Sequence, residues 1–107
     1  MNDVQHFEAA RALAERILAE SGKTTEERLA FLYRTVLSRR PYADEVRLLT
    51  AALARQRAIF DRDPHAAKAI VRAGESKPRG VAPEPETAAW TLVCNLVLNL
   101  DETLTRN

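Results

Sequence analysis

The sequence is poor in the residues that interrupt or cross-link a chain. It has three glycines, five prolines and one cysteine among 107 residues. So few glycines and prolines, beside 46% hydrophobic residues, exclude collagen-like, low-complexity and disordered classes. A single cysteine excludes an internal disulfide framework and a cysteine-rich metal site. The formal net charge of +1 gives no overall attraction to nucleic acid, membranes or acidic substrates.

Long apolar runs are also missing. The most apolar stretch, residues 92–100, is interrupted by Asn95 and Asn99 and is far shorter than the ~20 residues of a membrane span. The N-terminus begins Met1-Asn2-Asp3 and lacks the basic start and apolar core of a signal peptide. We therefore predict no membrane span and no targeting segment in this sequence, although it can still be part of an exported protein.

Helix-forming residues dominate what is present. The chain contains 18 alanines, 13 leucines and 13 arginines, a mixture that favours helices. Apolar residues recur at intervals of three and four, and no alternating strand pattern or internal repeat is visible. The predicted helices span residues 3–21, 24–40, 43–61 and 64–72, and a last helix ends near residue 105. We predict one all-α domain over residues 1–107, a compact bundle of about five helices.

Residues at the helix ends support these boundaries. Thr24 and Glu27 form a capping-box pattern, and Pro41 is expected to stop the second helix. Asp63-Pro64 is a cap followed by proline at the first helical position. One loop, residues 75–85, contains proline and glycine and precedes the last helix.

The last helix is expected to bury a continuous apolar seam. Its members recur at helical spacing: Ala89, Val93, Leu96, Val97, Leu100 and Leu104. Trp90 lies beside the seam and is expected to be buried. Cys94 lies inside this apolar helix, so it is better interpreted as a small buried hydrophobe than as a nucleophile.

Metal-ligating and acid–base residues form no recognisable site. His6 and His65 lack a second histidine at ligand spacing and are interpreted as surface residues. The carboxylate pairs at 26–27 and 44–45 lie at helix starts, where the helix dipole accounts for them. Asp101 and Glu102 lie near a helix C-terminus instead, which suggests a specific cationic partner. We predict no catalytic residue, no metal and no cofactor in this segment.

Charge is unevenly distributed along the chain. Residues 23–57 hold eight basic and four acidic residues, whereas residues 73–107 hold five acidic and three basic residues. We expect these two parts to face each other. Four arginines of the basic part could bind phosphate: Arg39, Arg40, Arg55 and Arg57. Because interleaved aromatics and a glycine-rich loop are missing, a solvated face with salt bridges is favoured over nucleic-acid binding.

The loop and the last helix carry most of the remaining polar residues. Asparagines on an apolar helix usually bond to a neighbouring backbone, and the long loop has many amides without regular partners. We therefore expect Asn99 and Trp90 to hold the loop. A ligand pocket at the same place is the alternative.

Several segments, in the same order over nearly the whole chain, resemble one family. They are Asn2-Asp3, FEAARALAER at 7–16, LYRTVLSRRP at 32–41 followed by Glu45, Asp63-Pro64, Gly74-Glu75-Ser76, Ala88-Ala89-Trp90 and LNLDETLTR at 98–106. Together they resemble the C-terminal part of the planctomycete-specific domain of unknown function that accompanies cytochrome c-type domains. The LNLDE run is the most specific piece. Val4 replaces a usual proline, and Tyr42 replaces a small capping residue, which puts the side-chain cap of the third helix in doubt.

The resemblance implies an origin more than an activity. Proteins of this family are large, often exported, and carry a separate haem-binding cytochrome-like domain upstream. The chain would then be a C-terminal fragment of a multidomain protein, with an exported or cell-envelope parent. No catalytic residues are established for the family, so none is carried over, and the haem would lie outside this segment.

Three hypotheses follow. The first is a non-catalytic helical module that packs on upstream domains of its parent or on a protein partner, with the oligomeric state open. The second is a shared active or ligand site of a redox or carbohydrate-acting protein, and the third is weak phosphate or nucleic-acid binding by the arginine face. The candidate structural or interaction positions are Arg39, Pro41, Glu45, Trp90, Asn99, Asp101 and Glu102.

Overall fold

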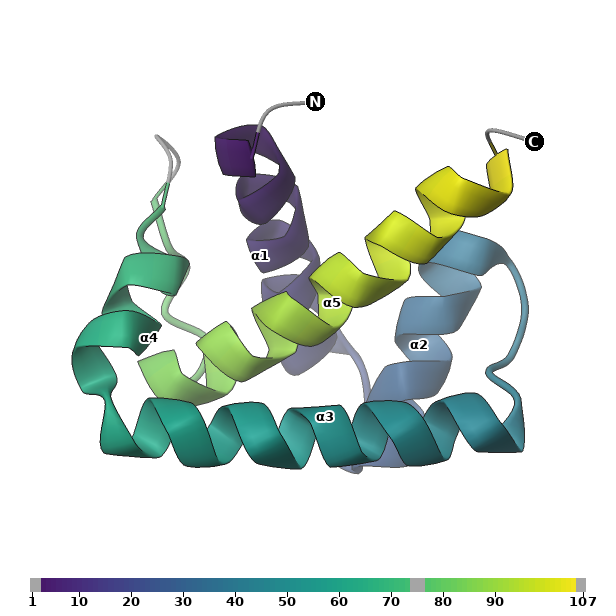
Figure 1. Ribbon diagram of the computed structural model, residues 1–107, viewed down its shortest axis with the longest axis horizontal. Helices are drawn as coiled ribbons and strands as arrows, with labels where there is room; N and C mark the ends of the chain where they lie inside the picture. The colour runs from purple at the N-terminus through teal and green to yellow at the C-terminus, as the bar shows by residue number, and fades with distance from the viewer. Residues whose placement is uncertain (1–2, 74–76, 106–107) are drawn as a thin grey trace.

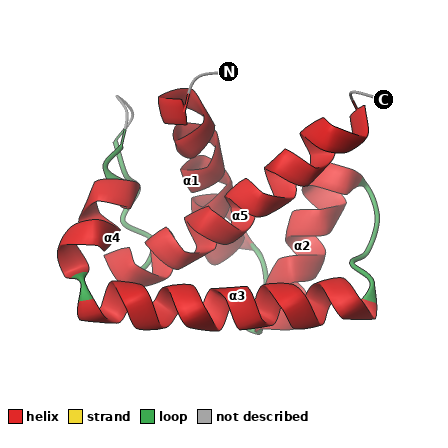
Figure 2. Cartoon of the chain, viewed as in Figure 1, coloured by secondary structure: helices red, strands yellow, loops and turns green. Residues whose placement is uncertain are grey.

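Five α-helices make up the structure, a computed structural model that describes the backbone of residues 3–73 and 77–105 and the side chains of residues 7–73 and 77–101. They are α1 (Asp3–Glu20), α2 (Thr25–Leu37), α3 (Ala43–Arg62), α4 (Pro64–Val71) and α5 (Glu84–Thr105). No strand occurs in these described ranges (Figure 2). The prediction of an all-α bundle of about five helices is confirmed.

The helix ends follow the local chemistry of the chain. The Thr24 side chain accepts a hydrogen bond from the Glu27 amide at 3.1 Å, and the Thr24 amide donates to the Glu27 carboxylate at 3.2 Å. Asp63 likewise accepts from the Ala66 amide at 3.1 Å and caps α4. Both predicted caps are therefore confirmed.

Two boundaries differ from the prediction. Helix α2 ends at Leu37 rather than at Pro41, because Ser38 adopts a left-handed conformation with φ of 57° and terminates the helix. Helix α5 begins at Glu84, so Pro85 lies in its first turn and not in the loop. Proline is well tolerated there, since the first amides of a helix have no intrahelical acceptor.

Helix α5 lies at the centre of the fold and contacts each of the other four helices. Figure 1 shows α3 along one edge of the molecule, α1 and α2 behind α5, and α4 at one end. Helices α3 and α5 lie close together near α4 and diverge toward the C-terminus of α5 (Figure 1). This divergence determines how much of each helix is covered.

The core is densest around the first half of α5, where Ala88, Ala89, Trp90, Val93 and Cys94 are fully buried. Helix α1 contacts α5, and its small residues Ala10 and Ala14 are fully buried as well. Burial raises the pKa of the Cys94 thiol, in agreement with the predicted role as a buried hydrophobe. None of the helices in the described part of the chain is long and apolar enough to cross a membrane.

Candidate functional site

The divergence of α3 and α5 leaves an apolar groove of about 330 Å³ on the surface, called the α3–α5 groove below. Its lining comes from three helices: Tyr33 of α2, Glu45, Leu48 and Leu49 of α3, and Leu96, Val97 and Leu100 of α5. Apolar side chains line most of it. Such a hollow on a protein surface is typical of a contact site for another apolar group.

Helical periodicity explains why these leucines meet in one place. Leu96 and Leu100 are one turn apart on α5, and Leu48 and Leu49 face them from the first half of α3. Leu48 remains 67% exposed and Leu96 51% exposed. The predicted continuous seam is therefore wrong at Leu96. Helices α3 and α5 diverge at this point, so α3 does not cover the side of α5 that carries Leu96.

A rigid ion pair closes one end of the groove. Arg39 donates two hydrogen bonds to Glu45, from Nη1 to Oε1 at 2.8 Å and from Nη2 to Oε2 at 3.0 Å. The Glu45 carboxylate also accepts from the Tyr42 amide at 2.8 Å. The Arg39 guanidinium lies 5.2 Å from the ring centre of Tyr33 and 4.4 Å from that of Tyr42. Arg39 therefore acts as a clamp on Glu45.

The electrostatics of this clamp keep Glu45 ionised. Its hydrogen bonds from Arg39 lower the pKa of Glu45 to about 2. Burial and the nearby carboxylate raise the pKa of Tyr33 to about 12. One end of the groove is thus formed by the Arg39–Glu45 ion pair and the neutral phenol of Tyr33. Because Glu45 stays ionised far below pH 7, it is unsuited to proton transfer near neutral pH.

A second carboxylate, Glu86, joins three helices beneath the buried half of α5. Glu86 accepts from Arg57 Nε at 2.9 Å and Nη2 at 2.5 Å, and from Trp90 Nε1 at 3.0 Å. Arg28 lies 3.7 Å from the same carboxylate. Burial raises the pKa of Glu86, but its bonds to Arg57 outweigh this and leave the pKa below its usual value. The expected meeting of the basic middle and the acidic last third occurs here.

Trp90 does not hold the loop as predicted. The indole N–H of Trp90, the one donor of its side chain, binds Glu86, and Trp90 itself is fully buried. Asn99 is exposed, three turns beyond Thr87 on the opposite half of α5 from the loop. The structure thus confirms the predicted burial of Trp90 but gives it a different partner.

The other candidate positions are distributed around the groove and the α2–α3 connection. Pro41 is half-buried in that connection, and Asp101 is half-buried on the second half of α5. The side chain of Glu102 lies outside the described residues. Among the predicted positions, Glu45 lines the groove and Arg39 holds it, whereas Trp90 lies in the core and cannot line a shared cleft with them.

The predicted arginine face is partly used within the fold. Arg39 binds Glu45 and Arg57 binds Glu86. Arg40 and Arg55 are exposed. The salt-bridged interpretation is therefore confirmed for two of these four arginines.

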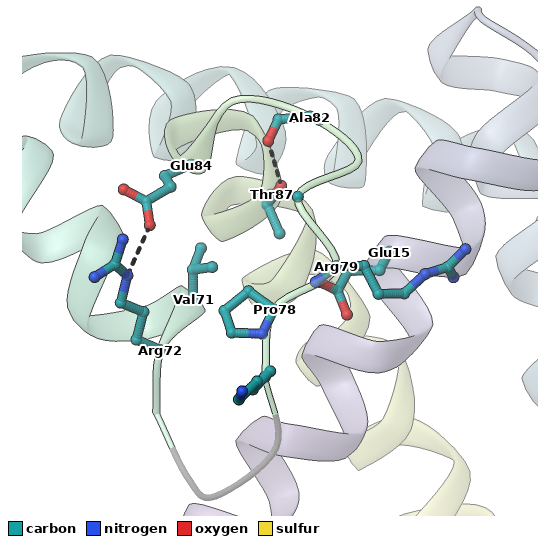
Figure 3. A pocket seen from close by; sticks show the side chains of 10 residues that line it. Glu15, Val71, Arg72, Pro78, Arg79, Ala82, Glu84 and Thr87 are labelled. Carbon is teal, nitrogen blue, oxygen red and sulfur yellow. Dashed lines mark hydrogen bonds and ion pairs between the residues drawn. The ribbon is translucent and has the colours of Figure 1, made fainter.

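A second hollow, about 670 Å³, lies between α1, the end of α4 and the loop before α5 (Figure 3). The buried Glu15 carboxylate accepts from the Arg79 amide at 2.6 Å and so holds the loop on α1. Arg72 pairs with Glu84 at 3.2 Å on the opposite side, as a dashed line in Figure 3 marks. Glu15 binds the Arg79 amide and Glu84 pairs with Arg72. We therefore interpret this hollow as the place where the loop is held against α1 and α4.

The sequence prediction missed the buried pair behind this loop. Arg11 donates to the Val71 carbonyl at 2.8 Å, and its Nε lies 3.8 Å from Glu15, one turn further along α1. Both side chains are almost fully buried. An arginine and a glutamate one helical turn apart, each directly following an alanine (Ala10 and Ala14), were the available signal.

The described side chains include His65, Cys94 and several carboxylates, which are residue types that can ligate a metal. They contain no group of three or more His, Cys, Asp or Glu side chains placed to bind one ion. His65 is exposed at the start of α4, and the side chain of His6 lies outside the described residues.

Comparison with known proteins gave no match to a protein-family model, to a curated protein or to a solved structure. The resemblance found in the sequence therefore stays a prediction.

Proposed function

We propose that this chain is a non-catalytic helical module that packs through the α3–α5 groove on another protein surface. That surface belongs either to upstream domains of its own polypeptide or to a separate partner. The observation that supports the proposal is an open apolar groove between two exposed leucines, Leu48 and Leu96. Burying a fully exposed leucine contributes about 1.5–3 kcal/mol, and covering the part of Leu48 or Leu96 that is still exposed contributes roughly half to two thirds of that amount.

The shape of the groove fits an apolar side chain of the partner. A volume of about 330 Å³ suits one or two large side chains inserted between the helices, in the manner of an anchor residue in a binding hot spot. The Arg39–Glu45 clamp fixes one wall and adds no unpaired charge. A preformed wall of this kind lowers the ordering cost of association.

The rival hypotheses have less support. A shared active site needs Trp90 in a cleft beside Arg39 and Glu45, yet Trp90 is fully buried. Phosphate binding by the arginine face is weakened because Arg39 and Arg57 already bind carboxylates. The groove thus remains the feature best suited to a function of this chain.

Site-specific photo-crosslinking tests the proposal. A photoreactive residue replaces Leu96 in the full-length protein expressed in its own cells, with the same residue at Thr50 as the control. Thr50 is also exposed but does not line the groove. Crosslinked peptides are identified by mass spectrometry, and the segment found is then titrated with purified protein.

The proposal expects one defined segment to crosslink at position 96 and not at position 50. In the titration, Leu96→Lys should weaken binding at least tenfold, whereas Thr50→Lys should leave it unchanged. Equal or absent crosslinking at the two positions, or a segment whose affinity ignores Leu96→Lys, would overturn the proposal.

A further inference from the structure

The connection between α4 and α5 contains a segment with few attachments, residues 77–82, which we call the strap. Residues 77–80 are exposed, and most of the strap borders the hollow of about 670 Å³ beside α1. Within the described part of the chain, no backbone–backbone hydrogen bond joins the strap to another segment. Segments of this kind open locally at a lower free energy than the core.

One strong hydrogen bond holds the strap in place. The Arg79 amide donates to Glu15 Oε2 at 2.6 Å, and Glu15 is only 3% exposed. A bond from an amide to an ionised carboxylate is shorter and stronger than one between neutral groups. The contact from the Thr87 hydroxyl to the Ala82 carbonyl is long, at 3.5 Å. The strap is therefore held mainly at Arg79.

The same turn of α1 also holds the other end of the connection. Arg11 Nη1 donates to the carbonyl of Val71, the last residue of α4, at 2.8 Å. Arg11 Nε lies 3.8 Å from Glu15 Oε1, and both side chains are almost fully buried. One buried ion pair on α1 thus ties the end of α4 and the strap, which are far from α1 in the sequence.

We propose that the strap opens and closes beside the hollow as a unit, and that the Arg11–Glu15 pair is its latch. Opening breaks the bond between the Arg79 amide and Glu15. It also widens the hollow, whose lining includes the buried Val71 and Thr87. The latch therefore controls access to the hollow. This inference is independent of the proposed function, because none of these residues lines the α3–α5 groove.

The ion pair makes the two attachments depend on each other. Replacing Glu15 deprives the buried Arg11 of this carboxylate, and replacing Arg11 deprives Glu15 of its cation. Losing one partner of a buried pair is costly, because the other charge stays buried. We therefore expect the loss of either residue to loosen both ends of the connection.

A second ion pair at the same connection offers a matched comparison. Arg72 and Glu84 pair at 3.2 Å, and Figure 3 shows them on the other side of Val71 and Pro78 from Glu15. This pair is largely exposed, and exposed pairs contribute little to stability. Breaking it should leave the strap closed.

Proteolysis of the folded chain by trypsin tests the latch, because the cleavage rate follows the population of the open form. Trypsin can cut after Arg79 when the strap is open, whereas Lys77 precedes a proline and resists cleavage. Glu15→Ala should raise the rate at Arg79 at least tenfold. Glu15→Gln keeps an acceptor oxygen for the Arg79 amide and should raise the rate less. Cleavage after Arg39, in the α2–α3 connection, should not change.

Two further variants separate the latch from a general loosening of the connection. Glu84→Gln should change the rate at Arg79 by less than about twofold. Arg11→Met should raise this rate, and combining it with Glu15→Ala should add less than about twofold to the larger single effect. Two effects that multiply in full would show independent attachments and overturn the latch. So would equal acceleration at Arg79 and Arg39 in Glu15→Ala.

Hydrogen exchange of the wild-type chain tests the strap without any variant. The Arg79 amide should exchange at least tenfold more slowly than in an unstructured peptide, because it is bound to Glu15. Its exchange should respond weakly to urea, since strap opening exposes little surface. Exchange of the Trp90 amide in the core should respond strongly. An Arg79 amide that exchanges as in a free peptide, or with the urea dependence of Trp90, overturns the proposal.

Discussion

The two halves of α5 lie in different environments although both are rich in apolar residues. From Ala88 to Cys94 the described side chains are fully buried except Leu92, which is partly buried. Further on, Leu96 is 51% exposed and Asn99 is exposed. The first half is enclosed by neighbouring helices, whereas the second half has lost α3 from one side (Figure 1). Apolar content alone therefore does not decide which half forms core.

The polar contacts of the two halves differ in the same sense. Glu86, in the first turn of α5, is bound by Arg57 of α3, by Trp90 and closely by Arg28 of α2. The carboxylate beside the second half, Glu45, belongs to α3 and is bound by its chain neighbour Arg39. Bonds between residues distant in the sequence therefore hold the enclosed first half of α5. The open second half lies beside the Arg39–Glu45 pair, whose two residues are close in the sequence. We infer that the first half stabilises the fold and the second serves contact.

Replacing the largest residue of the enclosed half should have the largest effect. Trp90→Ala removes a fully buried indole and should lower the free energy of unfolding by about 3–5 kcal/mol. Urea unfolding followed by circular dichroism measures this loss. A loss below about 1 kcal/mol would show that the two halves of α5 do not differ in the way described.

Removing the charge of Glu86 should have the next largest effect. Glu86→Gln leaves Arg57 and Arg28 without their carboxylate and should cost about 1.5–3 kcal/mol, as expected for hydrogen bonds to charged groups. Glu84→Gln is the matched control two residues earlier. Its pair with Arg72 is largely exposed, so that variant should lose less than about 1 kcal/mol. Equal losses in the same urea experiment would contradict the central role given to Glu86.

The contribution of Glu45, which lines the groove beside the second half of α5, to the free energy of unfolding should depend on pH in the acid range. The pKa of Glu45 is about 2 in the folded chain, below its ordinary value of 4.5. Its contribution is therefore fully present above pH 4.5 and is lost as the pH falls toward 2. At pH 7, Glu45→Gln should be less stable than the wild type by on the order of 1–2 kcal/mol.

Urea midpoints measured at several pH values check this prediction. The difference between wild type and Glu45→Gln should shrink steadily between pH 4.5 and 2. A difference that stays constant over that interval would mean that Glu45 is not held in its charged form by Arg39.

The fold was largely predictable because its determinants are local. Thr24 and Glu27 are three residues apart and cap one helix end, and Asp63-Pro64 starts another, so pattern and boundary coincide. The end of α2 was placed too late, since the left-handed Ser38 leaves no distinctive sequence pattern. Local chemistry thus fixed the helices but not every terminus.

The site was less predictable because its contacts join distant residues. Arg39 and Glu45 are six residues apart, and both were candidate positions. Arg57 and Glu86 are 29 residues apart, and periodicity cannot show which arginine reaches which carboxylate. Nor can it show that Leu96 is open, since that depends on the angle at which α3 leaves α5.

The smallest effect on stability should come from the open half itself. Leu96→Lys replaces a side chain that is already 51% exposed, so the free energy of unfolding should change by less than about 0.5 kcal/mol. Val97→Ala, its buried neighbour, should cost more than Leu96→Lys in the same experiment. The crosslinked segment described above should nevertheless bind Leu96→Lys at least tenfold more weakly. A variant that loses binding and keeps its stability assigns Leu96 to contact rather than to the core. A variant that loses both would place Leu96 in the core with the first half of α5.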